Sequence, residues 1–276
     1  MKKTVLITGA SSGFGKVTAK LFARNGWHVV ATMRKPGEQT DLVDTNDVLV
    51  TRLDVQDGDS IGKAIETGIT RFGTIDALIN NAGFGLFGVF EATSREKIQE
   101  QFDVNVFGVM DVTRAILPHF RTNKGGLIIN ISSGAGIFTL PMLSLYCASK
   151  FALEGFSESL SYELASQNIV VKIVEPGGVI STNFGKRSSE EARQNASVAD
   201  YEAFVTRTNA VFAGLRGERL ATEADVAKVI FEAATDGTSQ LRYVATADIL
   251  PLVKARRETS EKEYIELMRG RFMTGE

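Results

Sequence analysis

The stretch V-L-I-T-G-A-S-S-G-F-G at residues 5–15 decides the fold. It begins with three bulky apolar residues, as expected of a strand that is buried on both faces of a sheet. Three glycines follow, Gly9, Gly13 and Gly15, and a helical pattern over Phe14–Asn25 begins directly after the second of them. Glycines at a strand-to-helix turn let the backbone approach a phosphate, and the helix N-terminus supplies N–H groups and a positive dipole.

This turn has two interpretations. A tight strand-to-helix turn needs glycine in any case, and the spacing here is G-x-x-x-G-x-G rather than G-x-G-x-x-G. However, the turn follows the first strand and opens the first helix, which places it at the carboxyl edge of a sheet. We therefore expect it to bind a dinucleotide.

Further along the chain, short apolar runs alternate with longer helical patterns. The other expected strands are His28–Thr32, Val48–Leu53, Ala77–Ile79, Leu127–Ile131, Val170–Val174 and Leu241–Ala245. The other expected helices are Ser60–Phe72, Ser94–Phe120, Ser144–Ser166 and Thr222–Ala234. This alternation predicts an α/β protein with a Rossmann-type, doubly wound parallel sheet of about seven strands and helices on both faces. Such a sheet uses nearly the whole chain, so we expect residues 1–276 to form a single domain.

The composition is that of a soluble globular protein. Hydrophobic residues make up 43% of the 276 residues and the net charge is −2, which gives no basic footprint for nucleic acid. No apolar run has the length of a membrane span. Cys147 is the single cysteine, which favours a cytoplasmic protein, and the two histidines, His28 and His119, are too far apart to suggest a metal site. We expect no metal.

Polar or glycine-rich residues follow most of the expected strands. Ligands of open α/β sheets bind outside the carboxyl ends of the strands, where Asn81, Ser133 and Pro176-Gly177 fall. Arg34 and Lys35 follow the second strand, in a place where NAD-binding sites carry an acid. A basic loop in solvent is the plain explanation, but the missing acid favours a contact between Arg34 and a 2′-phosphate.

Three further polar residues have alternative roles. Asp54 could accept a hydrogen bond from an adenine amino group, whereas Asp57 or Asp59 would start the next helix. Asn81 could cap backbone groups at a strand end. Asn105 lies in an apolar helical stretch and must be hydrogen-bonded, either at a backbone kink or to a water.

Tyr146 and Lys150 are four residues apart on an expected helix and therefore lie on one face, one turn from each other. A nearby ammonium group favours the phenolate form of a phenol, which suits a general acid/base for a carbonyl or an alcohol. Residues 183–218 are polar and charged, with apolar positions at a helical period. They are either a lid over a substrate pocket or an ordinary pair of surface helices.

The motifs along the chain resemble those of the short-chain dehydrogenase/reductase family. In chain order they are T-G-A-S-S-G-F-G at Thr8–Gly15, N-N-A-G at Asn80–Gly83, N-V-F-G at Asn105–Gly108, I-S-S at Ile131–Ser133, Y-C-A-S-K at Tyr146–Lys150 and E-P-G-G at Glu175–Gly178. They cover roughly two-thirds of the chain.

This resemblance implies a catalytic tetrad of Asn105, Ser133, Tyr146 and Lys150. Tyr146 would donate a proton in reduction or accept one in oxidation, and Ser133 would hold the reacting oxygen. Lys150 would favour the tyrosinate and bind the nicotinamide ribose, and Asn105 would anchor a water on the proton path. The hydride moves to or from the nicotinamide ring.

The resemblance also implies a set of cofactor contacts. The turn residues Gly9, Ser11, Ser12, Gly13, Phe14 and Gly15 would meet the phosphates and the adenosine ribose. The remaining contacts would be Asp54 and Val55 to adenine, Asn81, Ala82 and Gly83 to ribose, and Pro176, Gly177 and Val179 to the nicotinamide carboxamide. The family places a Thr four residues after the glycine that follows the proline. Ser181 stands there instead, and we favour its neighbour Thr182.

The expected activity is that of an NADP-dependent oxidoreductase, with NAD the less favoured cofactor, acting on a ketone, an aldehyde or a secondary alcohol. An apolar pocket of Leu86, Phe87, Leu140, Met142 and Leu143 indicates a hydrophobic substrate. Related proteins are dimers or tetramers, so we expect a homodimer or homotetramer. The alternatives are a dinucleotide-sensing protein without catalysis and a lyase or epimerase that uses the same tyrosine.

Overall fold

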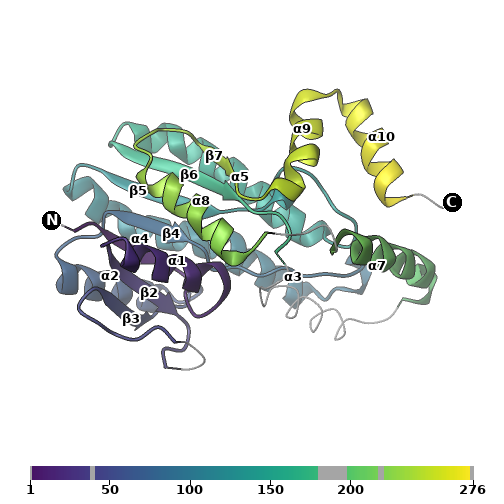
Figure 1. Ribbon diagram of the computed structural model, residues 1–276. Helices are drawn as coiled ribbons and strands as arrows, with labels where there is room; N and C mark the ends of the chain where they lie inside the picture. Colours follow the sequence, from purple (N-terminus) through teal and green to yellow (C-terminus); the bar gives the residue numbers. More distant parts are fainter. Residues whose placement is uncertain (1, 38–40, 180–197, 217–220, 274–276) are drawn as a thin grey trace.

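The sheet of this protein is parallel throughout. The computed structural model describes residues 2–37, 41–179, 198–216 and 221–273. Within them lies one seven-stranded sheet with strand order β3-β2-β1-β4-β5-β6-β7 (Figure 1). The strands are β1 (Thr4–Ile7), β2 (His28–Met33), β3 (Val48–Arg52), β4 (Ala77–Asn80), β5 (Gly126–Ile131), β6 (Ile169–Glu175) and β7 (Arg242–Val244). Every expected strand is present, with ends within a single residue of the prediction.

Helices cover both faces of the sheet, as expected. The helices α1 (Gly13–Arg24) and α8 (Glu223–Thr235) pack on one face. The helices α2 (Gly58–Phe72), α4 (Gly108–Thr122) and α5 (Ser144–Ala165) pack on the other. Successive strand residues point to opposite faces, which is why each strand needs a continuous apolar run.

The first strand illustrates how the two cores divide. Val5 and Ile7 join the core that contains Phe22 of α1, whereas Leu6 joins the core that contains Phe120 of α4. All of these side chains are fully buried. Truncation of such a residue to alanine costs about 2–5 kcal/mol of unfolding free energy.

The expected long helix Ser94–Phe120 is interrupted. It consists of α3 (Arg95–Phe102), a π-helical segment Asp103–Phe107 and α4. A π-helical segment changes the direction of the side chains that follow it. The sequence pattern showed the helix but not this interruption, which carries Asn105.

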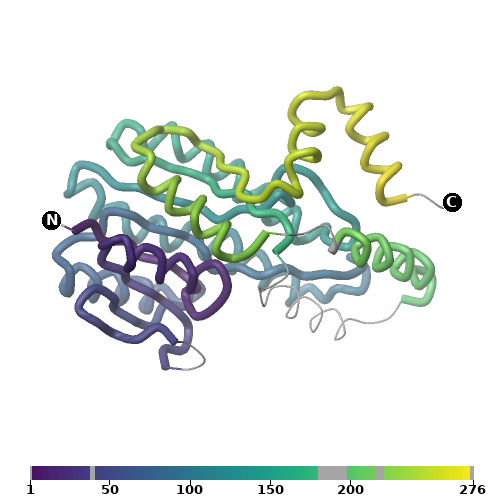
Figure 2. Tube along the Cα trace, viewed as in Figure 1, coloured from purple at the N-terminus to yellow at the C-terminus, as the bar shows by residue number. Residues whose placement is uncertain are grey.

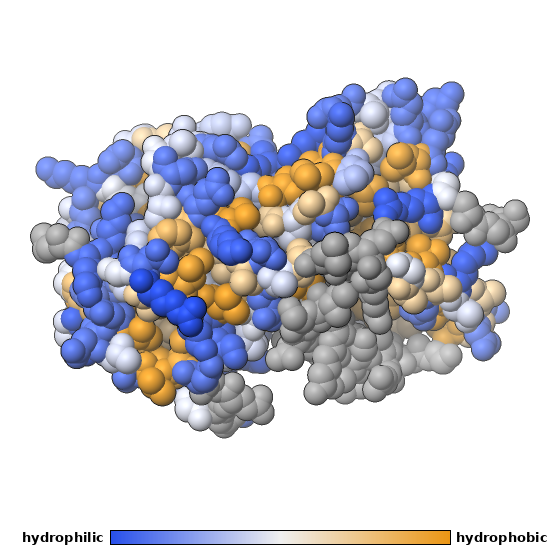
Figure 3. All heavy atoms as spheres, viewed as in Figure 1, coloured by the Kyte–Doolittle hydropathy of each residue, from blue (hydrophilic) through white to orange (hydrophobic). Residues whose placement is uncertain are grey.

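The C-terminal helices form a smaller core of their own. The helices α7 (Glu202–Arg216), α9 (Leu250–Glu258) and α10 (Glu261–Phe272) lie beyond the sheet, at the opposite end of the molecule from the N-terminus (Figures 1 and 2). Tyr264, Met268 and Phe272 of α10 are buried in this cluster. Hydrophilic side chains cover the outside of α9 and α10, and apolar side chains gather where these helices meet the rest of the molecule (Figure 3). None of the helices in the described ranges has the length and apolarity that crossing a membrane requires.

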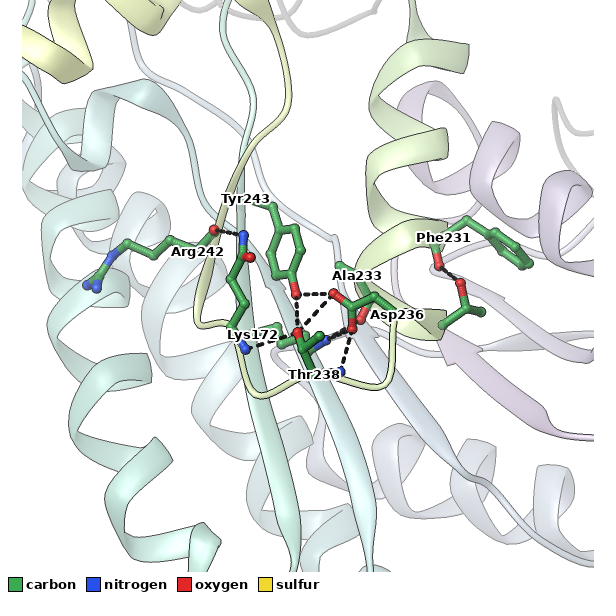
Figure 4. A network of polar contacts seen from close by, with 9 residues as sticks. Lys172, Phe231, Ala233, Asp236, Thr238, Arg242 and Tyr243 are labelled. Atoms are coloured by element: carbon green, nitrogen blue, oxygen red, sulfur yellow. Dashed lines mark hydrogen bonds and ion pairs between the residues drawn. The ribbon is translucent and has the colours of Figure 1, made fainter.

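A polar network around the buried Lys172 connects β7 with neighbouring elements. Lys172 of β6 donates to Asp236 Oδ1 at 2.5 Å and to Ala233 O at 2.8 Å, and Tyr243 and Thr238 also bond to Asp236 (Figure 4). Lys172 is 2% exposed, so its charge needs this carboxylate. The network joins the end of α8 to β7, the last strand of the sheet.

Candidate active site

The glycine turn after β1 is held by the neighbouring strand end. Asn81 Nδ2 donates to Thr8 O at 2.9 Å and to Gly9 O at 3.2 Å. Gly9 has a φ of +67°, and a side-chain carbon there would lie 2.9 Å from Ala82 Cα. A side-chain carbon at Gly15 would overlap Gly9 O. The capping role of Asn81 is therefore confirmed, and the turn needs glycine for conformation and for close approach.

The N-terminus of α1 fits an anionic group. Ser12 is the N-cap, its side chain makes no capping hydrogen bond, and the first turn carries no acid. By contrast, α2, α8 and α10 each have a side-chain cap and an acid in the first turn. There is also space beside the start of α1, because an added side-chain carbon at Gly13 would meet nothing within 4 Å. Such a helix end suits the pyrophosphate of a dinucleotide; Ser11, Ser12 and Phe14 line it.

The end of β2 lies beside this turn, since Ala10 N donates to Thr32 O at 2.8 Å. Arg34, two residues further on, is exposed. Among the described residues, Arg34 has no ion-pair partner, while the nearby Lys16 and Lys20 both pair with Asp41. The guanidinium group is therefore available beside the glycine turn.

The predicted adenine contacts lie after β3. Asp54 is half-buried and its Oδ1 accepts from Gln56 N at 3.1 Å. Val55 is 7% exposed, and a side-chain carbon at Gly108 would lie 2.8 Å from Val55 Cβ. Asp57, the alternative for a structural role, caps α2 by accepting from Ser60 N at 3.1 Å.

Ser133, Tyr146 and Lys150 come together at the end of β5. The Ser133 side chain hydrogen-bonds to Tyr146 and accepts from Ala135 N at 3.1 Å. Lys150 Nζ donates to Ile131 O at 2.8 Å and lies 5.8 Å from the centre of the Tyr146 ring. Tyr146 and Lys150 are 9% and 6% exposed. The loop between β5 and α5 thus places a serine hydroxyl against a buried phenol.

Burial dominates the ionisation of both helix residues. It raises the pKa of Tyr146 to about 12, against the opposing hydrogen bond from Ser133. It lowers the pKa of Lys150 to about 8, against the opposing charge of Glu154. The spacing of the two residues led us to expect an easier deprotonation of the phenol. In the structure, desolvation raises the pKa of Tyr146, and the opposing influence comes from Ser133.

Asn105 acts as a clamp in the π-helical segment. It is fully buried, its Oδ1 accepts from Phe84 N at 3.1 Å, and its Nδ2 donates to Phe84 O at 2.8 Å and to Ser149 Oγ at 3.2 Å. The exposed Gly83 lies beside it, because a side-chain carbon there would be 3.2 Å from Asn105 Oδ1 and 3.8 Å from Lys150 Nζ. Asn105 therefore lies next to Lys150 and fixes the chain that follows β4.

The loop after β6 is held by residues that the sequence did not indicate. Gly177 N donates to Thr246 Oγ1 at 2.8 Å, and Gly178 N donates to Asp248 Oδ2 at 3.1 Å. Pro176 O accepts from Gly134 N at 2.8 Å, which joins this loop to the one that carries Ser133. Thr246 and Asp248 lie just beyond the last expected strand. This position is the feature of the sequence that could have indicated their contact with the loop after β6. Val179 is partly buried at the end of the loop, whereas Ser181 and Thr182 lie outside the described residues.

The expected pocket residues come from two segments that meet. Gly88 N donates to Met142 O at 2.8 Å, which joins the segment of Leu86 and Phe87 to that of Met142 and Leu143. Leu143 packs with Tyr146. Phe87 makes an edge-on contact with Phe212 of α7, with ring centres 5.7 Å apart.

The fifth expected pocket residue, Leu140, packs into the C-terminal cluster. Leu86 is 4% exposed. In the part of the chain that the structure describes, no group of three or more His, Cys, Asp or Glu residues has an arrangement that could hold a metal ion.

Known proteins are similar to this chain in sequence. The family model described as short chain dehydrogenase matches residues 3–193. The 3-ketodihydrosphingosine reductase of Bacteroides thetaiotaomicron is 42% identical over 198 residues, which cover 71% of each chain. Retinol dehydrogenase 8 of Homo sapiens is 38% identical over 193 residues, 67% of this chain and 61% of its own length.

Solved structures share the fold over nearly the whole chain. A short-chain dehydrogenase from Streptomyces avermitilis has a TM-score of 0.83 and 32% identity, and the match covers 100% of this chain and 99% of that one. A short-chain dehydrogenase/reductase from Burkholderia phymatum in complex with NAD has a TM-score of 0.77 and 26% identity over 96% of this chain and 95% of its own. ElxO with NADP bound has a TM-score of 0.70 and 26% identity over 89% of this chain and 98% of its own. The chain therefore belongs to the short-chain dehydrogenase family, whose members are oxidoreductases that interconvert CH–OH and C=O groups.

Proposed function

We propose that this protein is an NADP-dependent oxidoreductase that interconverts a ketone or aldehyde and the corresponding alcohol on a hydrophobic substrate, with Tyr146 as the general acid/base. The observation that carries this proposal is the hydrogen bond between the half-buried Ser133 and the buried phenol of Tyr146. It lies at the carboxyl edge of the sheet, where Lys150 and the uncapped N-terminus of α1 also lie. Ligands of doubly wound sheets bind at this edge.

The residues divide the work as follows. Ser133 and Tyr146 hold the substrate oxygen through two hydroxyl groups. A phenol whose pKa is about 12 is protonated at neutral pH, as a proton donor to a carbonyl oxygen must be. Lys150 binds the nicotinamide ribose and replenishes the proton, and Asn105 fixes the chain beside it. The bound cofactor supplies or accepts the hydride.

A preference for NADP over NAD is supported by Arg34. This exposed guanidinium follows β2 beside the glycine turn, and Arg34-Lys35-Pro36-Gly37 contains no acid to hold a ribose 2′-hydroxyl. Arginine binds a phosphate bidentately. Among the structural relatives, one contains NAD and another NADP, so relatives of this fold use both cofactors.

A hydrophobic substrate is supported by the residues around Tyr146 and by the relatives. Leu143 packs against Tyr146, and Phe87 contacts Phe212 of α7. Two relatives are named for 3-ketodihydrosphingosine and retinol, both of which are largely hydrophobic molecules. We propose that α7, within the insertion at residues 183–218, closes the substrate side of a single-domain enzyme. Residues 183–197 and 217–218 of that insertion lie outside the described residues.

The substitution Tyr146→Phe tests the acid/base role. It should lower kcat by about a hundredfold or more, because the proton donor is lost, and should leave the Kd for NADPH nearly unchanged. Tyr162→Phe is the matched control, because Tyr162 lies on the same helix and is 71% exposed. Turnover that survives in the Tyr146 variant would contradict the assignment.

A substrate panel tests the reaction itself. Oxidation of NADPH is followed with long-chain ketones, retinal and small ketones or aldehydes, and is repeated with NADH. We expect turnover that increases with the apolar area of the substrate and is faster with NADPH. Tight NADPH binding without turnover of any carbonyl or alcohol would instead favour a dinucleotide-sensing protein. A cytoplasmic location stays part of this proposal and rests on the single, buried cysteine.

A further inference from the structure

The helix that carries the proposed catalytic residues continues into a line of charged residues. Tyr146, Lys150, Glu154 and Glu158 follow one another at four-residue spacing along α5 and therefore share one face of the helix. Glu154 is 6% exposed, whereas the Glu158 side chain is 43% exposed. A carboxylate that is buried one turn from Lys150 lowers the stability of the fold unless an opposite charge lies close to it.

Glu154 is held in place from the far edge of the sheet. Arg242 of β7 donates from Nε to Glu154 Oε2 at 3.0 Å and from its terminal nitrogen to Glu158 Oε2 at 2.5 Å. The Arg242 side chain points away from the network of Lys172, Asp236 and Tyr243 (Figure 4). Neighbouring residues of a strand face opposite sides of the sheet. The side chain of Tyr243 therefore lies on the face covered by α8, and that of Arg242 lies on the face covered by α5.

The second carboxylate oxygen of Glu154, Oε1, does not accept a hydrogen bond from Arg242. Among the described residues, Glu154 Oε1 is buried and has no hydrogen-bond partner, and the same is true of Ser132 Oγ. The two side chains meet at Gly136, where a side-chain carbon would lie 2.9 Å from Glu154 Cγ, 2.8 Å from Ser132 Oγ and 3.1 Å from Lys150 O. Glu154 is thus packed against the backbone of Lys150, with one oxygen left uncompensated.

Other charged groups lie near Glu154 and contribute to the electrostatic environment of Lys150. Glu175 of β6 is fully buried and repels Glu154, and it is paired with Arg257 of α9 at 2.8 Å. Arg242 Nε also lies 3.6 Å from Glu175 Oε1. Lys150 Nζ donates to Ile131 O, lies 5.8 Å from the centre of the Tyr146 ring and has Asn105 near it across Gly83. Glu154 is the anion that acts on Lys150, and it raises the pKa that burial lowers.

We propose that Glu154 is a positioning residue for Lys150: its carboxylate, anchored by Arg242, keeps the Lys150 ammonium protonated in a buried site. Glu154 does not touch the substrate. Because the catalytic use of Lys150 rests on the proposed function, the test separates the charge of Lys150 from its use in turnover.

The charge is measured directly, without cofactor or substrate. Lysines labelled with ¹³C at Cε are followed by NMR across pH, and the Lys150 signal is assigned by its loss in Lys150→Arg. In Glu154→Gln the Lys150 midpoint should fall by about one pH unit, because a nearby anion is removed in a medium of low dielectric. Glu154→Asp keeps the charge and should restore most of the midpoint.

Glu158→Gln is the matched control. It removes the same charge and a hydrogen bond to the same Arg242, but one helical turn further from Lys150 and nearer to solvent. It should leave the Lys150 midpoint within about 0.2 pH units of the wild type. An unchanged midpoint in Glu154→Gln, or equal shifts in the two variants, would overturn the proposal, because a purely structural brace predicts no selective shift.

Two further measurements complete the test. If Glu154→Gln does not fold, the double variant E154Q/R242Q compared with R242Q isolates the same carboxylate, since both partners of the pair are then neutral. The alkaline limb of the pH dependence of kcat/KM is then compared with the NMR midpoints. A limb that moves with the midpoint supports both proposals. A midpoint that moves while the limb does not supports the role of Glu154 and contradicts the catalytic role of Lys150.

Discussion

The ionisable residues of α5 are governed by packing that their spacing does not reveal. The interval between Tyr146 and Lys150 correctly placed them on one face of a helix. The interval could not reveal that Tyr146 is buried in a cluster with Ala135, where little water is left to stabilise a phenolate. Burial depends on residues from other segments, so the pKa of a group is a property of the folded chain.

The proposed preference for NADP rests on Arg34. Arg34→Ala should raise the Kd for NADPH about tenfold or more and change the Kd for NADH by less than about twofold, because the 2′-phosphate contact is lost only for NADPH. Both dissociation constants are measured by the fluorescence of the reduced cofactor. Arg24→Ala, an exposed arginine at the other end of α1, is the control. Equal losses for both cofactors would exclude the phosphate contact.

Glu175 makes the stability of the protein depend on pH. Burial and repulsion by Glu154 raise its pKa from 4.5 to about 7, although Arg257 and Arg242 oppose the shift. The folded protein therefore holds a proton that the unfolded chain has released. The resulting stabilisation is complete below pH 4.5 and is lost as the pH rises through about 7.

Between these pH values, the unfolding free energy of the wild type should fall by about 3 kcal/mol relative to Glu175→Gln. Urea denaturation at several pH values measures the difference. Glu158 should contribute a pH dependence of the unfolding free energy with the opposite sign, because its hydrogen bond with Arg242 lowers its pKa. A pH-independent difference for Glu175→Gln would show that its carboxyl group does not titrate in this range.

At the level of elements, the glycine turn could be predicted from the sequence, but the residues that contact and hold it could not. The three glycines and their place after the first strand indicated a close backbone approach. The approach itself involves Asn81 and Ala82, which lie more than seventy residues further along the chain. Similarly, the apolar pattern of residues 94–120 predicted a helix, while the π-helical segment depends on the contacts of Asn105 with Phe84.

Gly15→Ala should damage this turn. The added carbon would overlap Gly9 O and lie 2.5 Å from Asn81 Nδ2. We expect a loss of about 1–3 kcal/mol of unfolding free energy and a Kd for NADPH raised about tenfold or more. Thermal unfolding and fluorescence titration measure the two effects. Gly62→Ala, on the exposed face of α2 with nothing within 4 Å, should instead stabilise the protein by up to about 1 kcal/mol. The turn would not be closely packed if the two variants behaved alike.

At the level of the molecule, the sheet was the easiest feature to predict. Strands that are buried on both faces leave an unbroken apolar run, and seven such runs correspond to the seven strands. The C-terminal cluster was not predicted as a unit. Its core joins Phe138, Leu252 and Met268, which come from three separate segments, and no local pattern records which segments will meet.

The outer face of α5 supports an assembly of copies. Phe151 is 39% exposed and Tyr162 is 71% exposed, and they lie three turns apart on one face, with Gly155 between them. We propose a homodimer or homotetramer that pairs these faces. Light scattering after size-exclusion chromatography should give two or four times 29.9 kDa for the wild type.

Phe151→Glu should shift this assembly towards the monomer, because a charge is placed in the apolar contact. Val43→Glu is the control, since Val43 is 66% exposed in a different part of the molecule. The α5 interface is excluded if the Phe151 variant elutes with the mass of the wild type.

The glycine turn has one more consequence, which concerns the order in which a ribosome makes this chain. Thr8 is bonded to Ile79 and Asn81, and the loop after β6 is bonded to Thr246 and Asp248. The glycine turn therefore takes its shape only after β4 has been synthesised, and the loop after β6 does so only after Thr246 and Asp248 have been synthesised. A growing chain would therefore assemble this edge of the sheet in two stages. The glycine turn lies within residues 5–15, but the edge of the sheet to which it belongs is complete only after residue 248 has been synthesised.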